Sequence, residues 1–447
     1  RKYYLNMQTN NINEYDVVIT GGGIAGISAA VKAAQMGVKA LLIEQYGFLG
    51  GMSTAGMVSP FMKHSINGQA LVNGVYKSIE QEMLEMKGMI DNGFYASAFR
   101  LSVNKLLKKY GCHILLNCEL MSVNRSNEEI ESVEVFTDGK KIKIKGKVFI
   151  DTTGDAQLLY LGKLPWQKGS ETTGKLQALT MFFRMANINM KKVADYVIMN
   201  KDNFFNWMDY EFNIEKIISV AGYFKQVKKA ITEGRLSPEV EYIFFTTLPE
   251  HGEASFNTTN ILELDGSSSY DLTKAEIKGR NQVAQVVKLL QEEIPGFEKA
   301  FLLETAAQVG VRETRRAVGD YVYTGEDIRK GKKFEDAIAR GCYGIDIHGQ
   351  IDEDSVMEHL REGEYYEVPL RALFVSEIKN VLAAGRCISS TREGHSALRI
   401  MPTSAATGEA CGAAAAMAVK LGKDLRELLV KEVQRSISYN ISEIEHS

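Results

Sequence analysis

The sequence is short of several features that mark particular classes of protein. Its 447 residues carry a net charge of -3 at pH 7, which gives no electrostatic signature for nucleic acid or an anionic membrane surface. The longest run of small or apolar residues, 411–419, is far shorter than the roughly 20 residues that span a bilayer. We therefore expect neither a nucleic-acid partner nor a membrane span. A cytoplasmic location is the default expectation, and a removed leader stays open because the chain begins RKYYLNMQTN.

Cysteine is also scarce, and its five positions are scattered. No two of them form a CxxC pair, so the sequence predicts no disulfide framework, zinc site or cysteine-ligated iron–sulfur cluster, and we expect no metal. Cys387 follows Arg386, but a redox-active dithiol would need a second cysteine nearby. A buried thiol is the better interpretation of Cys387.

What the sequence does contain is a strand, glycine turn, helix and strand near its N-terminus. Residues 15–20, YDVVIT, predict a buried parallel strand, GGGIAG and an alanine-rich segment follow, and a second apolar strand ends in Glu44. Gly21, Gly23 and Gly26 fit the GxGxxG fingerprint, whose glycines allow a tight turn, backbone approach to a pyrophosphate and close helix packing. Glu44 is expected to accept hydrogen bonds from an adenosine ribose, and its charge disfavours NADP. These residues alone allow NAD or FAD.

A second glycine pair stands in GGMST, residues 50–54. A nicotinamide enzyme has no obvious use for a second loop that approaches phosphate here, whereas a long FAD molecule lying across the sheet does; the alternative is a flexible loop. The loop holds no histidine or cysteine, so we expect FAD to be bound non-covalently. The residues expected to contact the cofactor in this region are Gly21, Gly23, Ile24, Ala25, Gly26, Glu44, Gln45, Gly50, Gly51, Met52, Ser53 and Thr54.

The rest of the chain predicts an α/β fold in which a second unit interrupts a Rossmann-like domain. A helix is expected at 97–110, followed by a strand, a β-meander and a return strand that ends in KVFI. After residue 166 aromatic residues increase, and after Pro369 a strand (380–384) and a helix of small residues (403–421) follow. A helix is also expected at 272–293, with its apolar side made by Ala275, Ile277, Val283, Val286, Val287 and Leu290.

The predicted division is a discontinuous FAD-binding domain, an inserted α+β substrate (cap) domain and a tail. The first part of the FAD-binding domain is expected at 14–165, the cap at 166–369, the second part at 370–430 and the C-terminal tail at 431–447.

Several motifs in a fixed order resemble one known family. GGGIAG with GGMST, VFIDTTGDA (148–156), VGVRETRRAVGDY (309–321), IDIHG (345–349), VPLRALF (368–374) and the segment 383–416 resemble the FAD-dependent oxidoreductase family FAD_oxidored. Its relatives include the flavoprotein subunit of heterodisulfide reductase and, more distantly, the fumarate reductase group. The resemblance runs from about residue 16 to 420 and implies a glutathione-reductase-like FAD domain with an inserted cap.

The resemblance also implies roles for residues far from the first glycine turn. Asp151, Gly154 and Asp155 match the family's DxTGD turn near the pyrophosphate and ribityl chain, and the helix after 401 matches one whose N-terminus points at the flavin pyrimidine. Arg392 departs from the family, which often has histidine there, so a two-histidine role is not carried over. The further cofactor residues expected are Gly154, Asp155, Gly385, Arg386, Pro402, Thr403, Ala405 and Ala406.

A flavin performs the redox step itself, so the protein is expected to supply a proton donor or acceptor and to orient the substrate. His395, in a segment interpreted as a loop before the 403–421 helix, is the first candidate because its ordinary pKa is near working pH. The alternative is a structural histidine that bonds the loop backbone. Arg392 and Arg399 are candidates to clamp a carboxylate or to stabilise anionic flavin.

The motif RETRR offers a second group of candidates. Its arginines, Arg312, Arg315 and Arg316, are interpreted either as a solvated helix face or, if Arg312 faces the flavin, as a sign of an anionic substrate. His348, in IDIHG, is a further catalytic candidate.

The leading hypothesis is a dehydrogenase or reductase that transfers a hydride between flavin N5 and a small polar substrate, anionic if Arg312 faces the flavin. Two alternatives stay open: the flavoprotein component of a heterodisulfide-reductase-like electron-transfer complex, and a non-catalytic FAD-binding protein. The electron acceptor is unidentified, and a homo-oligomer stays an open alternative.

Overall fold

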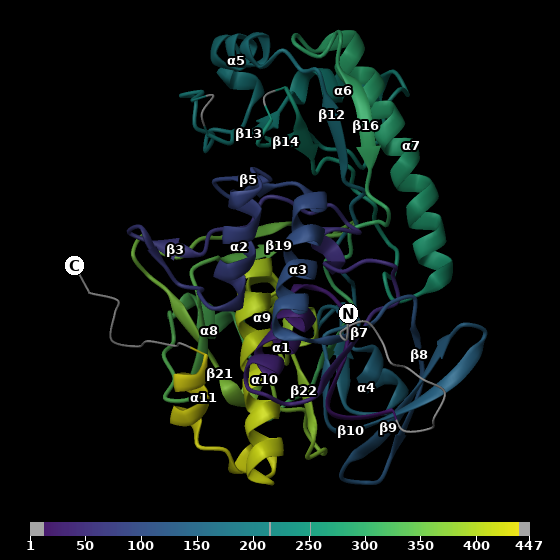
Figure 1. Ribbon diagram of the computed structural model, residues 1–447. Helices are drawn as coiled ribbons and strands as arrows, with labels where there is room; N and C mark the ends of the chain where they lie inside the picture. Colours follow the sequence, from purple (N-terminus) through teal and green to yellow (C-terminus); the bar gives the residue numbers. More distant parts are fainter. Residues whose placement is uncertain (1–12, 214–215, 251, 438–447) are drawn as a thin grey trace.

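The computed structural model describes residues 13–213, 216–250 and 252–437 (Figure 1). The N-terminal residues considered for a leader therefore lie outside the described residues. The predicted tail at 431–447 is described only to residue 437, within and just after α11 (Val430–Ser436). No described helix is long and apolar enough to cross a membrane.

A seven-stranded sheet forms the larger part of the molecule. Its long strand β10 pairs with β1 in parallel along one edge, and along the other edge with β9 in antiparallel and then with β22 in parallel. The sheet thus joins strands far apart in sequence, and the Rossmann-like α/β prediction is confirmed. Its strands in spatial order are β7 (His113–Leu115), β2 (Ala40–Ile43), β1 (Glu14–Thr20), β10 (Lys140–Asp151), β9 (Ile130–Thr137) and β8 (Glu119–Arg125), with β22 (Val381–Ala383) beside β10.

Both faces of the parallel part of this sheet are buried, which explains the uninterrupted apolar runs of β1 and β2. Val17 and Ile19 of β1 pack in a core shared with helices α1 (Ile24–Gln35), α3 (Ala96–Tyr110) and α10 (Met401–Leu421). Val18, between them, points into a second core with the meander and α4 (Gln157–Leu161).

Helices α1 and α10 lie unusually close together because α10 carries glycines where it crosses α1. A Cβ at Gly408 would collide with the backbone carbonyl of Ala25, and one at Gly412 with that of Ala29. The small-residue helix predicted at 403–421 begins two residues earlier, at Met401. This close packing sets the N-termini of the two helices against the same end of the sheet.

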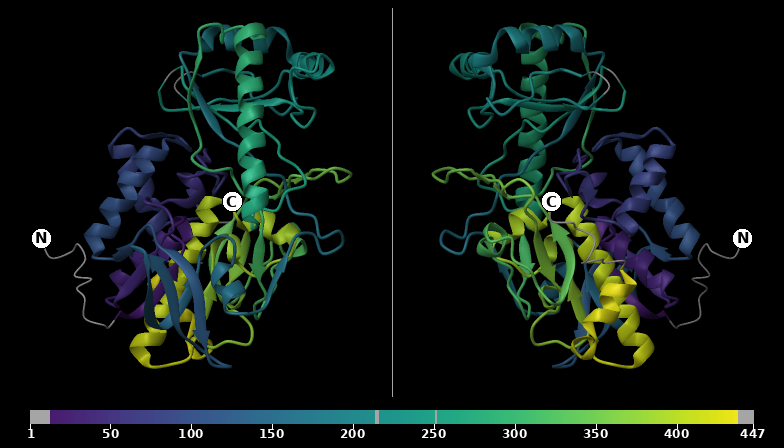
Figure 2. Two further views of the ribbon diagram at one scale, coloured as in Figure 1. Left: turned by 90° about the vertical axis from the view of Figure 1, so that its right-hand side faces the viewer. Right: turned by 90° about the vertical axis from the view of Figure 1, so that its left-hand side faces the viewer.

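A second lobe, residues 183–305, stands at the top of Figure 1 and has its own core. Its long helix α7 (Ser269–Glu293) runs down one side of the lobe toward the large sheet (Figure 2). The antiparallel sheet of this lobe has the order β13 (Ser219–Gly222), β14 (Ile243–Thr247), β15 (Ala254–Phe256), β12 (Phe183–Ala186) and β16 (Phe301–Thr305), and its other helices are α5 (Met190–Met199) and α6 (Phe224–Thr232).

Helix α7 begins three residues before its predicted start because Ser268 caps it, accepting a hydrogen bond from the Asp271 N–H. The placement of Ile277 on the apolar side is wrong, since its side chain is 62% exposed. The buried stripe runs through Ala275, Gly279 and Val283, and Ile277 lies two residues out of that spacing.

The remaining elements are β3 (Ser65–Ile66), β4 (Gln69–Ala70), α2 (Val75–Glu85), β5 (Met89–Ile90), β6 (Gly93–Phe94), β11 (Trp166–Lys168), β17 (Arg315–Ala317), α8 (Gly325–Arg329), β18 (Ala337–Gly341), β19 (Ile345–Ile347), β20 (Val356–Glu358), β21 (Tyr366–Pro369) and α9 (Arg392–Leu398). Of these, α2, α8, α9, β18, β19 and β21 contribute to the core shared with α1, α3 and α10.

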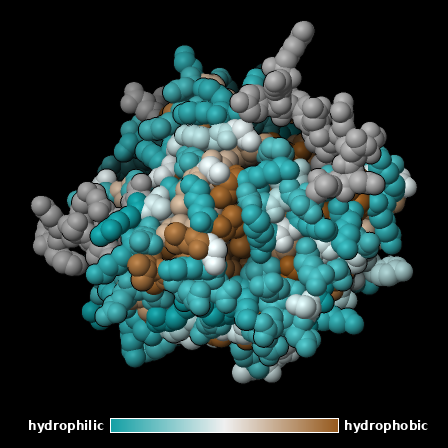
Figure 3. Space-filling view, turned by 60° about the horizontal axis from the view of Figure 1, so that its bottom comes forward, coloured by the Kyte–Doolittle hydropathy of each residue, from teal (hydrophilic) through white to brown (hydrophobic). Residues whose placement is uncertain are grey.

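Figure 3 views the molecule from the bottom of Figure 1 and shows an apolar strip within a mostly hydrophilic surface.

Candidate active site

The first glycine turn leaves open space only at its middle glycine. A Cβ on Gly21 would lie 2.5 Å from the Thr152 carbonyl oxygen, and one on Gly26 would collide with the Gly21 carbonyl, so both glycines hold α1 against the sheet. A Cβ on Gly23 would have Gly51 Cα, 4.0 Å away, as its nearest neighbour among the described residues. Gly23 is also the N-cap of α1, without a side-chain cap, so the first N–H groups of the helix can bind a phosphate.

The GGMST loop lies against this turn. The Gly50 N–H donates to the Gly22 carbonyl over 2.8 Å, and Gly51–Ser53 forms a short 3-10 helix. Gly50 and Gly51 have φ values of 116° and 53°, which favour glycine. The two glycine segments expected at a pyrophosphate are therefore neighbours in space.

Glu44 stands where β2 ends, beside the same turn. Its carboxylate is buried and accepts from the N–H groups of Gly22 (2.6 Å) and Tyr46 (2.9 Å). Burial raises the pKa of Glu44, and these two hydrogen bonds oppose that rise.

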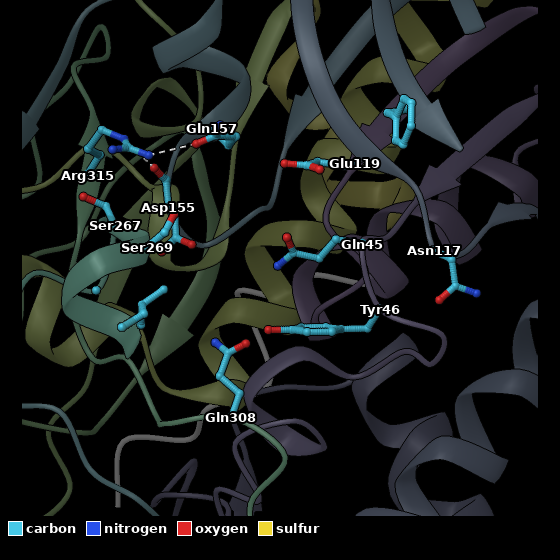
Figure 4. Close-up of a pocket in the computed structure, with 13 residues that line it drawn as sticks. Gln45, Tyr46, Asn117, Glu119, Asp155, Gln157, Ser267, Ser269, Gln308 and Arg315 are labelled. Atoms are coloured by element: carbon cyan, nitrogen blue, oxygen red, sulfur yellow. Dashed lines mark hydrogen bonds between the residues drawn. The ribbon is translucent and has the colours of Figure 1, made fainter. Parts of the chain in front are cut away.

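A cavity of about 540 Å³ opens next to Glu44 (Figure 4). Gln45, Tyr46 and Asn117 come from the ends of the sheet strands, while Ser267 and Ser269 come from the start of α7. Tyr46 and Asn117 were not among the residues predicted to line a site, although Tyr46 directly follows Glu44 and Gln45, which were predicted. The full lining is Gln45, Tyr46, Asn117, Glu119, Phe136, Asp155, Gln157, Gly266, Ser267, Ser269, Leu272, Gln308 and Arg315.

The DTTGD turn after β10 contacts the turn after β22. Arg386 donates from Nη2 to Asp155 Oδ1 over 3.1 Å and lies against Gly154. Cys387 is fully buried, and its sulfur accepts from the Gly154 and Ala156 N–H groups at 3.1 and 3.3 Å. Burial raises the pKa of Cys387 well above its usual value, and the prediction of a buried thiol is confirmed.

The N-terminus of α10 meets the GGMST loop, and that loop also contacts the segment before Arg312. Ser53 Oγ lies 2.8 Å from Met401 Sδ, and the Val311 N–H lies 3.5 Å from Met52 Sδ. Helix α10 has Pro402 in its first turn and no side-chain cap, so its first N–H groups are open to a ligand. Of the other residues expected here, Ile24, Ala25, Thr403 and Ala405 have buried side chains, whereas Ala406 is half-buried.

These surroundings fit FAD. Buried polar atoms in proteins almost always have a hydrogen-bond partner. Arg386 Nη1, His395 Nδ1 and Arg399 Nε are buried and lack a partner among the described residues. FAD carries hydrogen-bonding atoms along its pyrophosphate, ribityl chain and ring. The open space over Gly23 and two uncapped helix N-termini add sites for its negative charge.

His395 lies in the short helix α9, so its interpretation as a loop residue is wrong; Thr391 caps this helix. His395 is completely buried, and its Nε2 lies 3.2 Å from the Arg386 carbonyl oxygen. Burial, together with the charges of Arg316 and Arg399, holds the pKa of His395 well below its ordinary value. The backbone contact matches the structural alternative, and a neutral imidazole is a poor proton donor near pH 7.

The interpretation of RETRR as a solvated helix face is also wrong. The segment enters strand β17, where Arg315 and Arg316 are 6% and 1% exposed. Arg316 pairs with Glu313 of the same motif and, at 3.2 Å, with Glu171, whose proximity the sequence does not reveal. Arg315 donates to the Asp155 carbonyl over 2.8 Å.

Arg392 is occupied in the same way, so it is not available to clamp a ligand. Its Nε lies 3.2 Å from Glu313 Oε2, and its other nitrogens bind the Glu353 carboxylate, with Nη2 to Oε2 at 2.9 Å. These carboxylates outweigh the effect of burial and raise the pKa of Arg392.

Arg312 and Arg399 differ from Arg316 and Arg392, each of which pairs with two carboxylates. In the described part of the chain, Arg312 donates only to uncharged groups: the Ala178 carbonyl (2.8 Å), Thr180 Oγ1 (2.6 Å) and Asn257 Oδ1 (3.3 Å). Burial and repulsion by Arg399 lower the pKa of Arg312 to about 10, so it stays charged near pH 7.

The carboxylate that acts electrostatically on both arginines is Asp346, on β19. Its Oδ2 accepts from the Tyr343 hydroxyl over 2.8 Å and lies 3.6 Å from Arg399 Nη2, while Oδ1 lies 3.4 Å from His348 Nε2. Burial opposes ionisation of Asp346, but His348 and Arg399 outweigh it and lower its pKa. Burial and Arg312 lower the pKa of His348 to about 3. Tyr343 and Asp346 were not predicted, although Asp346 stands within IDIHG.

Comparison with known proteins agrees with this geometry. Over 151 residues the chain is 31% identical to leghemoglobin reductase from Glycine max and 32% identical to mitochondrial dihydrolipoyl dehydrogenase from Pisum sativum. Each alignment covers 32% of this chain but only 28% and 29% of those relatives. A flavin-dependent brominase structure, 12% identical, shares the fold with a TM-score of 0.50, over 95% of this chain and 83% of that one.

One family accounts for nearly the whole sequence. Residues 16–437 match the family described as FAD dependent oxidoreductase, the family that the motifs predicted. The chain therefore belongs to the FAD dependent oxidoreductase family: it is an enzyme, and its cofactor is FAD.

Proposed function

We propose that the protein transfers a hydride between FAD N5 and a small carboxylate-bearing substrate, and that Arg312 and Arg399 bind the substrate carboxylate. The observation that carries this proposal is a charge imbalance. Arg399 contacts the Asp346 carboxylate, whereas Arg312 bonds only uncharged groups among the described residues, so two guanidinium charges lie near one carboxylate that only Arg399 contacts. A buried charge without a partner is costly, so a ligand anion is the natural complement to this excess positive charge.

The position of this excess charge supports a role in the reaction. Arg312 follows Val311, which contacts Met52 of the GGMST loop, and Arg399 immediately precedes Ile400, the N-cap of α10. FAD supplies acceptance or donation of a hydride. The chain's own residues hold FAD through the glycine turns, Glu44, Arg386 and the N-terminus of α10, and they fix the substrate through the two arginines.

We keep, as part of this proposal, the division of the chain that the sequence predicts. In this proposal, segments 14–165 and 370–430 make a glutathione-reductase-type FAD domain, and 166–369 is an inserted cap. Arg312 anchors on Ala178, Thr180 and Asn257, so the cap would carry one of the two arginines, and the segment before α10 the other.

The test compares matched compounds on the FAD-loaded protein under anaerobic conditions. We expect lactate, glycolate or proline to bleach the flavin, and propane-1,2-diol or pyrrolidine, which lack the carboxylate, to fail. Reduction by the compounds without a carboxylate alone would overturn the anion site. Reduction by dithiols but by no carboxylate would favour the heterodisulfide-reductase-like alternative.

Variants test the two arginines directly. Truncating one partner of a buried charge pair costs about 2 kcal/mol or more, so Arg312→Gln and Arg399→Gln should each raise the half-saturating substrate concentration at least about thirtyfold. Arg361→Gln is the control, because the Arg361 side chain is 89% exposed. If both variants keep full FAD content and the half-saturating substrate concentration of the wild type, the assignment is contradicted.

A further inference from the structure

His348 belongs to the group of charges around Arg312 and Arg399 and is connected to it by the backbone. The Ala178 N–H donates to the His348 carbonyl over 3.3 Å, and the Ala178 carbonyl accepts from Arg312. The imidazole is 31% exposed, whereas His395 is fully buried. His348 can therefore exchange a proton with solvent where His395 cannot.

Asp346 fixes the protonation pattern of this imidazole. With His348 Nε2 at 3.4 Å from Asp346 Oδ1, the carboxylate favours a proton on Nε2 and leaves the lone pair on Nδ1. Asp346 is itself held by the Tyr343 hydroxyl, and its backbone N–H donates to Ser396 Oγ over 3.1 Å. A neutral imidazole oriented by a fixed carboxylate is the arrangement that a general base requires.

We propose that His348, positioned by Asp346, accepts a proton from the substrate, and that the substrate is a 2-hydroxy or 2-amino carboxylate. This inference rests on the proposed function, because the carboxylate held by Arg312 and Arg399 places the neighbouring carbon and its hydroxyl or amino group beside His348.

The step balances for a 2-hydroxy carboxylate. The C–H bond breaks and its hydrogen leaves with both electrons to FAD, the O–H bond breaks and its proton goes to His348 Nδ1, and the C–O bond becomes C=O. The products are a 2-oxo carboxylate, two-electron-reduced FAD and a His348 imidazolium that loses its proton to solvent. An amino carboxylate gives the imino acid in the same way.

The surrounding charges make this base dependent on bound substrate. The charged groups that act on His348 are Arg312, Arg399 and Asp346; the two arginines lower its pKa and Asp346 raises it. A carboxylate bound between the arginines offsets their positive charge and leaves the effect of Asp346. The imidazole therefore becomes a stronger base when the site is filled, and the empty site keeps it neutral.

The first test measures this coupling without turnover. FAD-loaded protein is labelled with ¹³C at histidine Cε1 and observed by NMR. The signal that is missing from the spectrum of His348→Asn belongs to His348. The pH titration of this signal is then followed with and without saturating propionate. Propionate has the carboxylate but no 2-hydroxyl. An opposite charge at contact distance shifts a pKa by about 1 to 3 units, so we expect a rise of at least about one unit at His348. Exposed His359 should not move.

The outcomes separate the two proposals. Propionate that perturbs the flavin spectrum but leaves the His348 titration unchanged would overturn the role of His348 and keep the anion site. If propionate changes neither the flavin spectrum nor the His348 titration, and Arg312→Gln and wild type respond to it alike, the anion site itself would be overturned.

The second test is kinetic. With whichever of lactate, glycolate, malate, alanine or proline reduces the flavin, His348→Asn should slow flavin reduction about 10²- to 10⁴-fold while half-saturation changes little. His359→Asn is the matched control. Asp346→Asn should move the pH profile of the reduction rate, which a purely structural role would not do. A His348→Asn variant with full FAD content and the wild-type rate would overturn the proposal.

Discussion

Gly23 and Gly26 offer a way to separate the folding role of the glycine turn from its ligand role. Gly23 has φ -70° and ψ 178°, values that alanine adopts, and a Cβ there would meet no atom of the described protein closer than 4.0 Å. Gly23→Ala should therefore leave the apoprotein as stable as wild type or raise its stability by about 0.4–1 kcal/mol. A Cβ at Gly26 would instead collide with the Gly21 carbonyl, so Gly26→Ala should destabilise the protein.

The same methyl group should interfere with FAD. It would occupy the open space over the N-terminus of α1, where backbone approach to the pyrophosphate is expected. Overpacking of one methyl costs about 1–3 kcal/mol, so Gly23→Ala should weaken FAD binding roughly 5- to 150-fold. The assay is FAD titration of apoprotein by flavin fluorescence, paired with urea unfolding of the apoprotein. An unchanged Kd, or an apoprotein as unstable as Gly26→Ala, would refute the assignment of this space to the cofactor.

Two further predictions concern buried ionisable groups. Glu44→Gln removes a charged acceptor, and hydrogen bonds to charged groups contribute about 1.5–3 kcal/mol, so FAD affinity should fall at least about tenfold; equal flavin content in the purified variant would count against a ribose contact. His395 keeps a pKa well below its ordinary value near 6.5, so an unfolded chain takes up a proton that the native protein rejects, and stability is lost as pH falls below about 6.5. His395→Gln should lose stability less steeply there, by up to about 1.4 kcal/mol per pH unit in urea unfolding; parallel slopes would show that His395 titrates normally.

The cofactor side of this site could be predicted because its signals are local. Gly21 and Gly26 each have a steric reason to be glycine in the protein itself, and Gly23 is the position where we expect the cofactor to require one. All three lie between one strand and one helix. The Gly408 and Gly412 contacts with α1 show the limit of local reasoning: small residues in α10 predicted a helix, but not which helix it would touch.

The catalytic side could not be predicted to the same extent because a charge in a sequence does not reveal its partner. RETRR would form a solvated face only if its arginines had no carboxylate partners from elsewhere in the fold. Arg316 instead pairs with Glu171, which lies 145 residues away in the sequence. The error at Ile277 has a different, local cause, because this residue lies two positions from Ala275 and Gly279 and so falls outside the buried stripe of the helix.

The excess charge at the proposed substrate site is therefore a property of the fold rather than of any motif. Among the described residues, Arg392 pairs with Glu353 and Glu313, and Arg316 pairs with Glu313 and Glu171. Arg315 donates to the Asp155 carbonyl and to Gln157 instead. Arg312 and Arg399, the two arginines that act on Asp346, are therefore the ones that we assign to the ligand. Asp346 then compensates one of these two charges and at the same time orients His348. Because one carboxylate does both, the charge that recognises the substrate and the base that deprotonates it are coupled, and an isosteric change at Asp346 must alter both together.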